Sequence, residues 1–258
     1  MDYSIVNFEG YRFLMIEELS EIGLNNAMTT RDMDVGLKTN NDIESIRSNL
    51  NKVYEFLKIE PKVLFNGYQA HTGNIQLIKS LDDGLEGPFG RYFPNTDGLI
   101  TDLDSIALIT RFADCVPVIL FDRKRKVQAN LHSGWKGTLQ RIGKKGVEVM
   151  ICEYQCDVND IVAIIGPAIG KYDFEVEEDV SSQFAETFPL WKDLIVKKNE
   201  KKYLIDLQEI VFRMLVDSGI GQDKITKIDI STFSDERFHS YRRDRQDYAL
   251  MGFITMIG

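Results

Sequence analysis

Two histidines and one cysteine are the residues of this sequence that could do chemistry together. His71 lies in the segment NGYQAHTGNI, Cys115 in TRFADCVPVILFD and His132 in ANLHSGWKG. All three lie at the ends of segments that we predict to be β-strands, and a rigid sheet can direct side chains from its strand ends into one cleft. Two imidazoles and a thiolate suit zinc or copper. Three protein ligands leave a fourth position open, as in a catalytic zinc site.

The same residue types allow other interpretations. The long intervals between the three residues match no short metal-binding motif. A histidine at a strand end is commonly a hydrogen-bonded boundary residue, and Cys115 could be an ordinary buried thiol. Cys115 could also be a nucleophile with His71 or His132 as its base, and Asp114 could orient that histidine. From the residues alone, these alternatives stay open.

Arginines in two segments are candidates for holding an anion. Arg242 and Arg243 lie in ERFHSYRRDRQDY, and a guanidinium group grips phosphate or carboxylate in two places. Arg31, which follows a predicted strand in AMTTRDMD, allows the same interpretation. A solvated basic loop is the alternative at both places.

Hydrophobic periodicity predicts helices and strands that alternate without a strict order. The helix over 42–57 has apolar residues at steps of three and four, and Asn41 or Asp42 can cap it. Thr138 can cap a helix that runs to about Tyr154, and further helices are expected within 175–188 and over 206–218. The predicted strands are 3–8, 11–17, 62–69, 74–79, 105–112, 116–121, 126–132, 161–165, 194–198, 202–206, 224–230 and 249–257. Such a mixture favours an α/β or α+β fold with mixed sheets over a doubly wound parallel sheet.

Composition limits the classes of function. The chain has 258 residues, with 43% hydrophobic and 28% charged, which is typical of one soluble globular domain over 1–258. A net charge of −9 argues against broad binding of nucleic acid or of an anionic membrane. Three cysteines and an N-terminal segment without the pattern of a signal peptide lead us to expect a cytoplasmic protein.

Seven segments in a fixed order carry a resemblance to a known family. They are TTR, QAH, NTDGLITD, TRFADCVPVILFD, NLHSGWKGT, IGPAIGKYDFEV and SYRRD. Together they resemble the YfiH-type family, long labelled laccase-domain or polyphenol oxidase proteins and now regarded as purine nucleoside phosphorylases. In that family the corresponding two histidines and cysteine form a zinc site, which places it here at His71, Cys115 and His132.

The resemblance implies a fold and a chemistry. The fold is a single compact α/β domain with packed mixed sheets and helices outside, related to a bacterial toxin deamidase, the cytotoxic necrotizing factor. The implied activities are phosphorolysis of adenosine, inosine and methylthioadenosine, and deamination of adenosine. Asp114 would serve as an acid, a base or an orienting residue. The implied partners are a purine nucleoside and inorganic phosphate, with the chain a monomer or a small homo-oligomer.

Candidate substrate-binding residues follow from the implied activity. Phosphate could be held by four basic residues, Arg31, Lys136, Arg242 and Arg243. The indole of Trp135 could stack on a base, with packing in the core as the alternative. The chain departs from the family pattern at Asp32-Met33-Asp34, at Lys136, and at Lys171-Tyr172-Asp173, and none of these changes removes a metal ligand.

Three rival functions remain. A copper-dependent polyphenol oxidase is the older family label, but three histidines are too few for a multicopper centre, which leaves a single copper in the same site. A metal-free Cys-His hydrolase is the second rival, and a non-enzymatic binding partner is the third.

Overall fold

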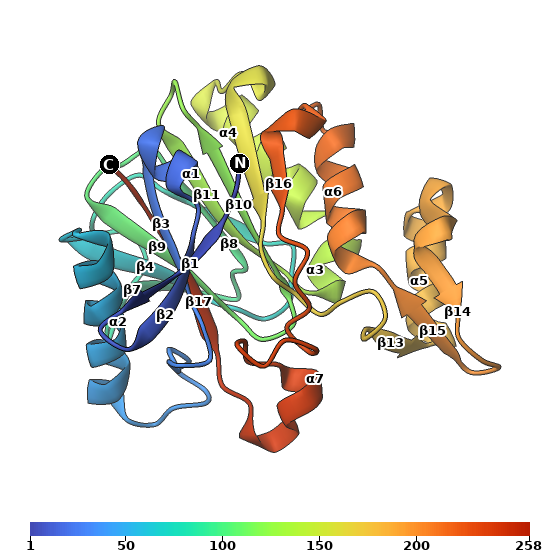
Figure 1. Ribbon diagram of the computed structural model, residues 1–258. Coiled ribbons are helices and arrows are strands. Elements are labelled where there is room, and N and C mark those ends of the chain that lie inside the picture. The colour runs from blue at the N-terminus through green and yellow to red at the C-terminus, as the bar shows by residue number, and fades with distance from the viewer.

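The computed structural model, which describes residues 1–258, is built around two large mixed β-sheets (Figure 1). The first has eight strands in the order β1-β2-β3-β17-β9-β4-β7-β6. They are β1 (Ser4–Phe8), β2 (Tyr11–Met15), β3 (Leu24–Thr29), β4 (Val63–Tyr68), β6 (Leu85–Gly87), β7 (Gly90–Pro94), β9 (Ile106–Phe112) and β17 (Met251–Ile257). Strand β4 is parallel to both of its neighbours, β7 and β9, and the other pairs are antiparallel.

The second large sheet has six strands in the order β16-β12-β10-β11-β8-β5. They are β5 (Ile75–Ile78), β8 (Gly98–Thr101), β10 (Val116–Asp122), β11 (Val127–Ser133), β12 (Ile161–Ile165) and β16 (Ile225–Lys227). A third, small sheet joins β13 (Glu175–Glu177), β15 (Lys202–Ile205) and β14 (Ile195–Lys197) in that order. Parallel and antiparallel pairs occur together in the six-stranded sheet, as the sequence predicts.

The chain forms seven α-helices, most of which pack against one of the three sheets. They are α1 (Glu17–Glu21), α2 (Ile43–Leu57), α3 (Trp135–Leu139), α4 (Ile142–Tyr154), α5 (Glu178–Thr187), α6 (Leu207–Asp217) and α7 (Tyr241–Asp244). Helix α2 begins where the Asp42 side chain accepts a hydrogen bond from the Ser45 N–H, and it ends at Lys58 in the left-handed conformation.

The core has four parts, and the smallest joins Phe65 of β4 with Leu99 of β8. The other three follow from this layering. Helix α2 packs on the eight-stranded sheet, where Leu50 meets Ile109 and Ile254. Helices α4 and α6 pack on the six-stranded sheet. The third part lies between the two sheets and joins Phe253 of β17 with Phe121 of β10. Because both faces of β10 and β11 are covered, every residue of these two strands is buried.

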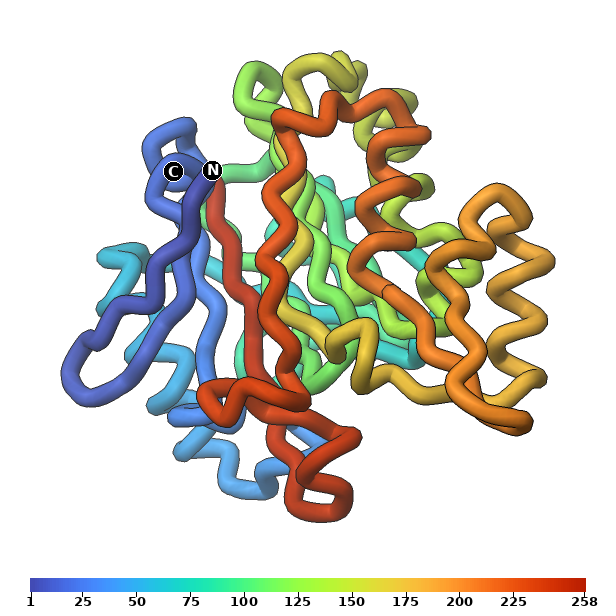
Figure 2. Tube along the Cα trace, turned by 45° about the vertical axis from the view of Figure 1, so that its right-hand side comes forward, coloured from blue at the N-terminus to red at the C-terminus, as the bar shows by residue number.

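The small sheet and α5 stand apart from this layered body. Figure 2 shows the chain leaving the second sheet after β12, forming this unit and returning through α6. No helix of the structure has both the length and the apolar composition that crossing a membrane requires.

Several predicted elements need correction. The helix assigned to Thr138 starts earlier, because Gly134 is its N-cap, and Thr138 lies inside α3 with its hydroxyl donating to the Gly134 carbonyl. The chain then turns at Arg141, where φ is +58°, before α4 begins. Residues 175–177 are the strand β13, so α5 starts only at Glu178, and the strand predicted over 224–230 is limited to β16.

Segments without a prediction also form structure. Residues 85–101 contain three short strands, β6, β7 and β8, and α7 forms inside the segment SYRRD. Glycine and proline are frequent in the first two of these strands, LEG and GRYFP, which hides the alternation that marks a strand.

Candidate metal centre

The structure brings His71, Cys115 and His132 to one point. One donor atom from each residue lies within 4.8 Å of those of the other two. The rings of the two histidines meet edge to face, with their centroids 5.0 Å apart. His132 is buried, Cys115 is partly exposed and His71 is the most exposed of the three.

Strand pairing explains how residues distant in sequence come together. Strand β10 starts directly after Cys115 and pairs with β11 so that Val116 lies opposite Ser133 and Pro117 opposite His132. His71 comes from the loop after β4, in the other sheet, and its φ of +60° is left-handed. The site therefore lies where the ends of the two large sheets meet.

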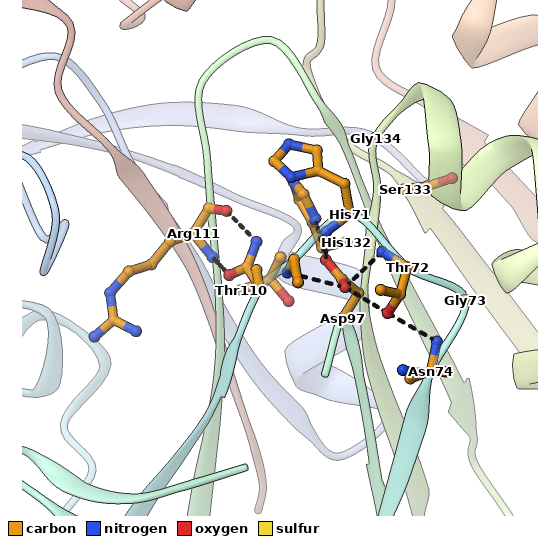
Figure 3. Close-up of polar contacts among 12 residues, drawn as sticks. His71, Thr72, Gly73, Asn74, Asp97, Thr110, Arg111, His132, Ser133 and Gly134 are labelled. Carbon is orange, nitrogen blue, oxygen red and sulfur yellow. Dashed lines mark hydrogen bonds and ion pairs between the residues drawn. The ribbon is translucent and has the colours of Figure 1, made fainter. Parts of the chain in front are cut away.

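Asp97, which precedes β8, holds the two histidines in place. Its Oδ1 lies 2.8 Å from His132 Nδ1 and accepts a hydrogen bond from the His71 N–H at 3.1 Å. Its Oδ2 accepts from the N–H groups of Ala70 and Thr72 and from the Thr72 hydroxyl (Figure 3). Because Nδ1 of His132 is committed to Asp97, its Nε2 is the nitrogen left for a metal.

The sequence interpretation missed Asp97. Its place in the segment NTDGLITD was the only indication, and the chain has 40 acidic residues. A carboxylate that orients a ligand histidine is recognised by its contacts rather than by its type.

Asp114 connects the metal centre to the C-terminal part of the chain. Its φ is +83°, and its side chain is buried. Oδ1 accepts a hydrogen bond from the Thr232 hydroxyl and Oδ2 accepts one from the Arg242 N–H, both at 2.7 Å. One carboxylate oxygen thus holds the loop before α7, and the other holds the first turn of α7.

The environment favours a thiolate at Cys115. Burial alone would raise the pKa of the thiol, but charge interactions and hydrogen bonds with His132 and His71 lower it below its usual value. For His132, burial would lower the pKa, whereas Cys115 and Asp97 together raise it. The thiolate is the form of cysteine that binds metals, and a bound cation would take the place of the proton on the imidazole.

The three residues fit a zinc or copper ion. Zinc binds sulfur at about 2.3 Å and nitrogen at about 2.0–2.1 Å, so donors within 4.8 Å of one another need only a small movement to share one ion. The His71 ring has no carboxylate partner of the kind that Asp97 provides for His132, so this exposed side chain can move to bind the ion. The donor set and the committed Nδ1 of His132 therefore support a three-ligand site with one open position.

The centre lies in the wall of a cavity of about 820 Å³. Of the residues predicted to bind substrate, three line this cavity: Trp135, Lys136 and Arg242. The Lys136 Nζ lies 5.3 Å from the centroid of the Trp135 ring, and the indole also packs against the core beneath α4 and α6. Arg242 Nη1 donates to the Glu175 carbonyl at 2.9 Å.

Arg31 and Arg243 do not line the cavity. The guanidinium of Arg243 donates to the carbonyls of Thr232, Phe233 and Phe238, so it holds the loop before α7 together. The guanidinium of Arg31 lies 3.6 Å from Asp244. Two basic residues that sequence analysis did not select, Lys38 and Arg111, do line the cavity.

Comparison with known proteins identifies the family. The family described as multi-copper polyphenol oxidoreductase laccase matches residues 22–257. This chain belongs to that laccase-domain family. The membership expected from the sequence motifs is confirmed.

Relatives of this laccase-domain chain carry the names of enzymes. The purine nucleoside phosphorylase YlmD of Bacillus subtilis strain 168 is 26% identical over 262 residues, which cover 94% of each chain. Adenosine deaminase RL5, from an unknown prokaryotic organism, is 36% identical over 132 residues, which are 51% of this chain and 50% of the relative. The crystal structure of the hypothetical protein YfiH of Bacillus licheniformis superposes with a TM-score of 0.87 at 27% identity, covering 97% of this chain and all of that one. The expected α/β fold with packed mixed sheets is confirmed.

Proposed function

We propose that residues 1–258 form one catalytic domain, a cytoplasmic zinc-dependent enzyme that cleaves purine nucleosides with phosphate. Adenosine, inosine and methylthioadenosine are the proposed substrates, and hydrolytic deamination of adenosine is a second activity. The observation that carries the proposal is the cluster of His71, Cys115 and His132 in the wall of a cavity large enough for a nucleoside. The names of the relatives add the substrate class.

Phosphorolysis makes two demands on the cavity. An oxygen of phosphate forms a bond to the ribose C1′ while the bond from C1′ to the purine breaks. The purine takes the electron pair of the broken bond and a proton. The phosphate needs cationic residues beside the ribose, and the base needs a surface that holds it. Among the sequence candidates, the basic residues Lys136 and Arg242 line the cavity, and the Trp135 indole offers a surface for the base.

Deamination requires a nucleophilic water. When bound, zinc would supply it by lowering the pKa of a water molecule to about 7. Asp97 holds His132 in the orientation that leaves Nε2 available. Asp114 holds the Arg242 backbone and so fixes that wall of the cavity.

The test is metal analysis of the purified protein followed by product analysis. About one zinc per chain is expected, and adenosine with phosphate should give adenine and ribose 1-phosphate, whereas adenosine without phosphate should give inosine. His71→Ala and Cys115→Ala should lose both metal and turnover. Cys152→Ala, which removes an exposed thiol, is the matched control and should keep both. Full turnover in His71→Ala would refute the proposal.

A copper-dependent oxidation of phenols is the second candidate, because the family description names that activity. The third histidine, His239, is buried and belongs to no metal-ligand cluster, so one metal ion is the most that the histidines can hold. Copper in place of zinc, with oxidation of a phenol and no release of adenine, would favour this function.

A metal-free hydrolase is the third candidate, favoured by the lowered pKa of Cys115 next to His132. Such an enzyme would keep its activity in a strong chelator and lose it on alkylation of Cys115. A zinc enzyme would lose activity in the chelator and regain it when zinc is restored.

A further inference from the structure

The cavity has a basic end and an acidic end. The basic end consists of Lys38 and Arg111, which belong to the side of the molecule with α2, β4 and β9. The acidic end consists of Glu175, Glu177 and Asp179, from β13 and the start of α5. Figure 1 shows α2 and α5 on opposite sides of the molecule. In Figure 3 the Arg111 side chain extends away from the two histidines, on the side opposite to Gly134.

Arg111 is a buried cation without an anionic partner. The residue is 6% exposed, and no carboxylate oxygen lies within 4.0 Å of its guanidinium. Nε donates to the Val35 carbonyl at 2.6 Å and Nη1 to Asn66 Oδ1 at 3.2 Å. Nη2 is buried and has no hydrogen-bond partner. Buried charges are normally paired, and the hydrogen bonds of Nε and Nη1 hold this guanidinium in a fixed orientation with Nη2 unpaired.

The groups around Arg111 leave its charge largely uncompensated. Burial lowers its pKa to about 10, and Tyr54 and Asp34 act against this change, so the side chain stays protonated at neutral pH. The Asp34 Oδ1 is occupied by the N–H groups of Gly36 and Leu250 and by the Thr39 hydroxyl. Lys38 adds a second positive charge to this end of the cavity, with its Nζ 4.6 Å from the centroid of the Tyr68 ring.

The other cations of the cavity are less suited to hold a phosphate. Lys136 is exposed, as Lys38 is, but it belongs to α3 and not to the part of the cavity wall that holds the buried, unpaired Arg111. Arg242 already donates to the Glu175 carbonyl, and the carboxylates of the acidic end lie on the same part of the chain. Negative charge there opposes the approach of a phosphate, while the basic end attracts it.

We propose that Arg111 and Lys38 form a phosphate-binding subsite at the basic end of the cavity. The proposal rests on the nucleoside phosphorylase function proposed above and specifies where the phosphate lies. Two sources share this chemistry, inorganic phosphate and the phosphate group of a nucleoside 5′-monophosphate. The fork of Arg111 provides the fixed contact, and Lys38 provides a flexible charge at the opening.

Calorimetric binding of inorganic phosphate to the metal-loaded protein tests the subsite without any turnover. Lys38→Ala should raise the Kd about tenfold and Arg111→Lys about 10–100-fold, as expected for charge-assisted hydrogen bonds. Zinc content and binding of adenosine should stay unchanged. Lys171→Ala is the matched control, because Lys171 is an exposed lysine over a tyrosine ring outside the cavity, 5.1 Å from the Tyr172 centroid.

Since Arg111 also donates hydrogen bonds to Val35 and Asn66, its variants could fold poorly. In that case the phosphate affinities of Lys38→Ala and Lys38→Glu test the subsite, and we expect the larger loss of affinity for the glutamate variant.

A second titration compares adenosine 5′-monophosphate with adenosine. Tighter binding of the monophosphate, lost in the Lys38 variants, would assign the subsite to a substrate phosphate instead of the free ion. Unchanged phosphate binding in all Lys38 and Arg111 variants would overturn the subsite, and so would a loss of phosphate binding in Lys136→Ala alone. A wild-type protein that binds neither inorganic phosphate nor the phosphate group of the monophosphate would also overturn it. A wild type that binds phosphate through Lys38 but releases no adenine would instead refute the phosphorylase function.

Discussion

Two regions that border the cavity differ in how they are built. The metal centre rests on β9, β10 and β11, in which every residue is buried between layers. The opposite wall consists of the small sheet and α5, whose strands have only two buried residues, Val176 and Ile205. Lysine–glutamate pairs lie on its surface, such as Lys198, which follows β14, with Glu175 of β13 at 2.7 Å.

The difference shows how one cavity can combine fixed and variable parts. Metal ligands must keep their donor atoms within a fraction of an ångström, which a packed core can enforce. The exposed ion pairs of the small sheet tolerate substitution because each pair contributes little. We therefore expect mutations near the centre to have large effects and mutations in the small sheet to have small ones.

The largest effect is expected for Asp97→Ala. The change leaves His132 and four donors from residues 70–72 without their buried partner, and loss of one member of a buried pair costs about 3–5 kcal/mol. Urea unfolding and a zinc competition assay would measure the loss. Asp97→Asn, which keeps an acceptor, should fold and lose about 10–100-fold in metal affinity. If Asp97→Ala were as stable as the wild type, the contrast between the packed region around the candidate metal centre and the small sheet would be wrong.

Gly134→Ala should have the next largest effect. A Cβ at this position would lie 2.8 Å from His71 Cδ2 and 3.0 Å from Cys115 Sγ, so two candidate metal ligands must move. Overpacking of this kind costs about 1–3 kcal/mol, and metal affinity should fall with it. Gly143→Ala in α4 is the control, because its new Cβ meets nothing closer than 3.4 Å. Equal metal affinity in the two variants would contradict the prediction.

A smaller, pH-dependent effect is expected at Asp32. Its hydrogen bonds with Arg12 lower the pKa of this carboxyl to about 2, although partial burial acts in the opposite direction. A depressed pKa stabilises the fold above about pH 4, and this contribution is lost as the pH falls from about 4 to 2. Because Arg12 is 39% exposed, screening limits the contribution to about 1 kcal/mol. Thermal unfolding of Asp32→Asn between pH 2 and 7 should show a flatter profile than the wild type, with zinc binding at pH 7 unchanged.

The smallest effect is expected for Lys198→Ala in the small sheet. Its ion pair with Glu175 is solvent-exposed, so at 150 mM salt neither the melting temperature nor the zinc content should change measurably. A large loss of metal would show that the small sheet supports the centre, and the contrast between the two walls would then be wrong.

Prediction from sequence succeeded where residue type and spacing carry the information. Apolar residues spaced three and four apart predict the helix α2, and continuous apolar runs predict the strands β9 to β12. The three candidate ligands could be selected because imidazole and thiol groups are rare here, and their meeting at one point was not visible in the spacing.

The residues that sequence missed act through tertiary contacts. Asp97 is one carboxylate among many until β8 places it against His132. Arg111 is the second-last residue of the apolar strand β9, and only its three-dimensional surroundings show that its charge lacks a partner. Val176, Val180, Phe184 and Phe188 share a helical spacing, yet Val176 lies in β13 because it pairs with Tyr203.

The left-handed backbone at His71 and Asp114 implies a conflict between durability and catalysis. Side chains other than glycine are disfavoured in this conformation, by an amount on the order of 1 kcal/mol at each position. Glycine at either place would relax the loop but would abolish a candidate ligand or the carboxylate that anchors α7. Selection for heat resistance alone would therefore favour glycine at the exposed His71 and would remove that candidate ligand. At Asp114 the two hydrogen bonds of the buried carboxylate offset the strain, so no such pressure is expected there.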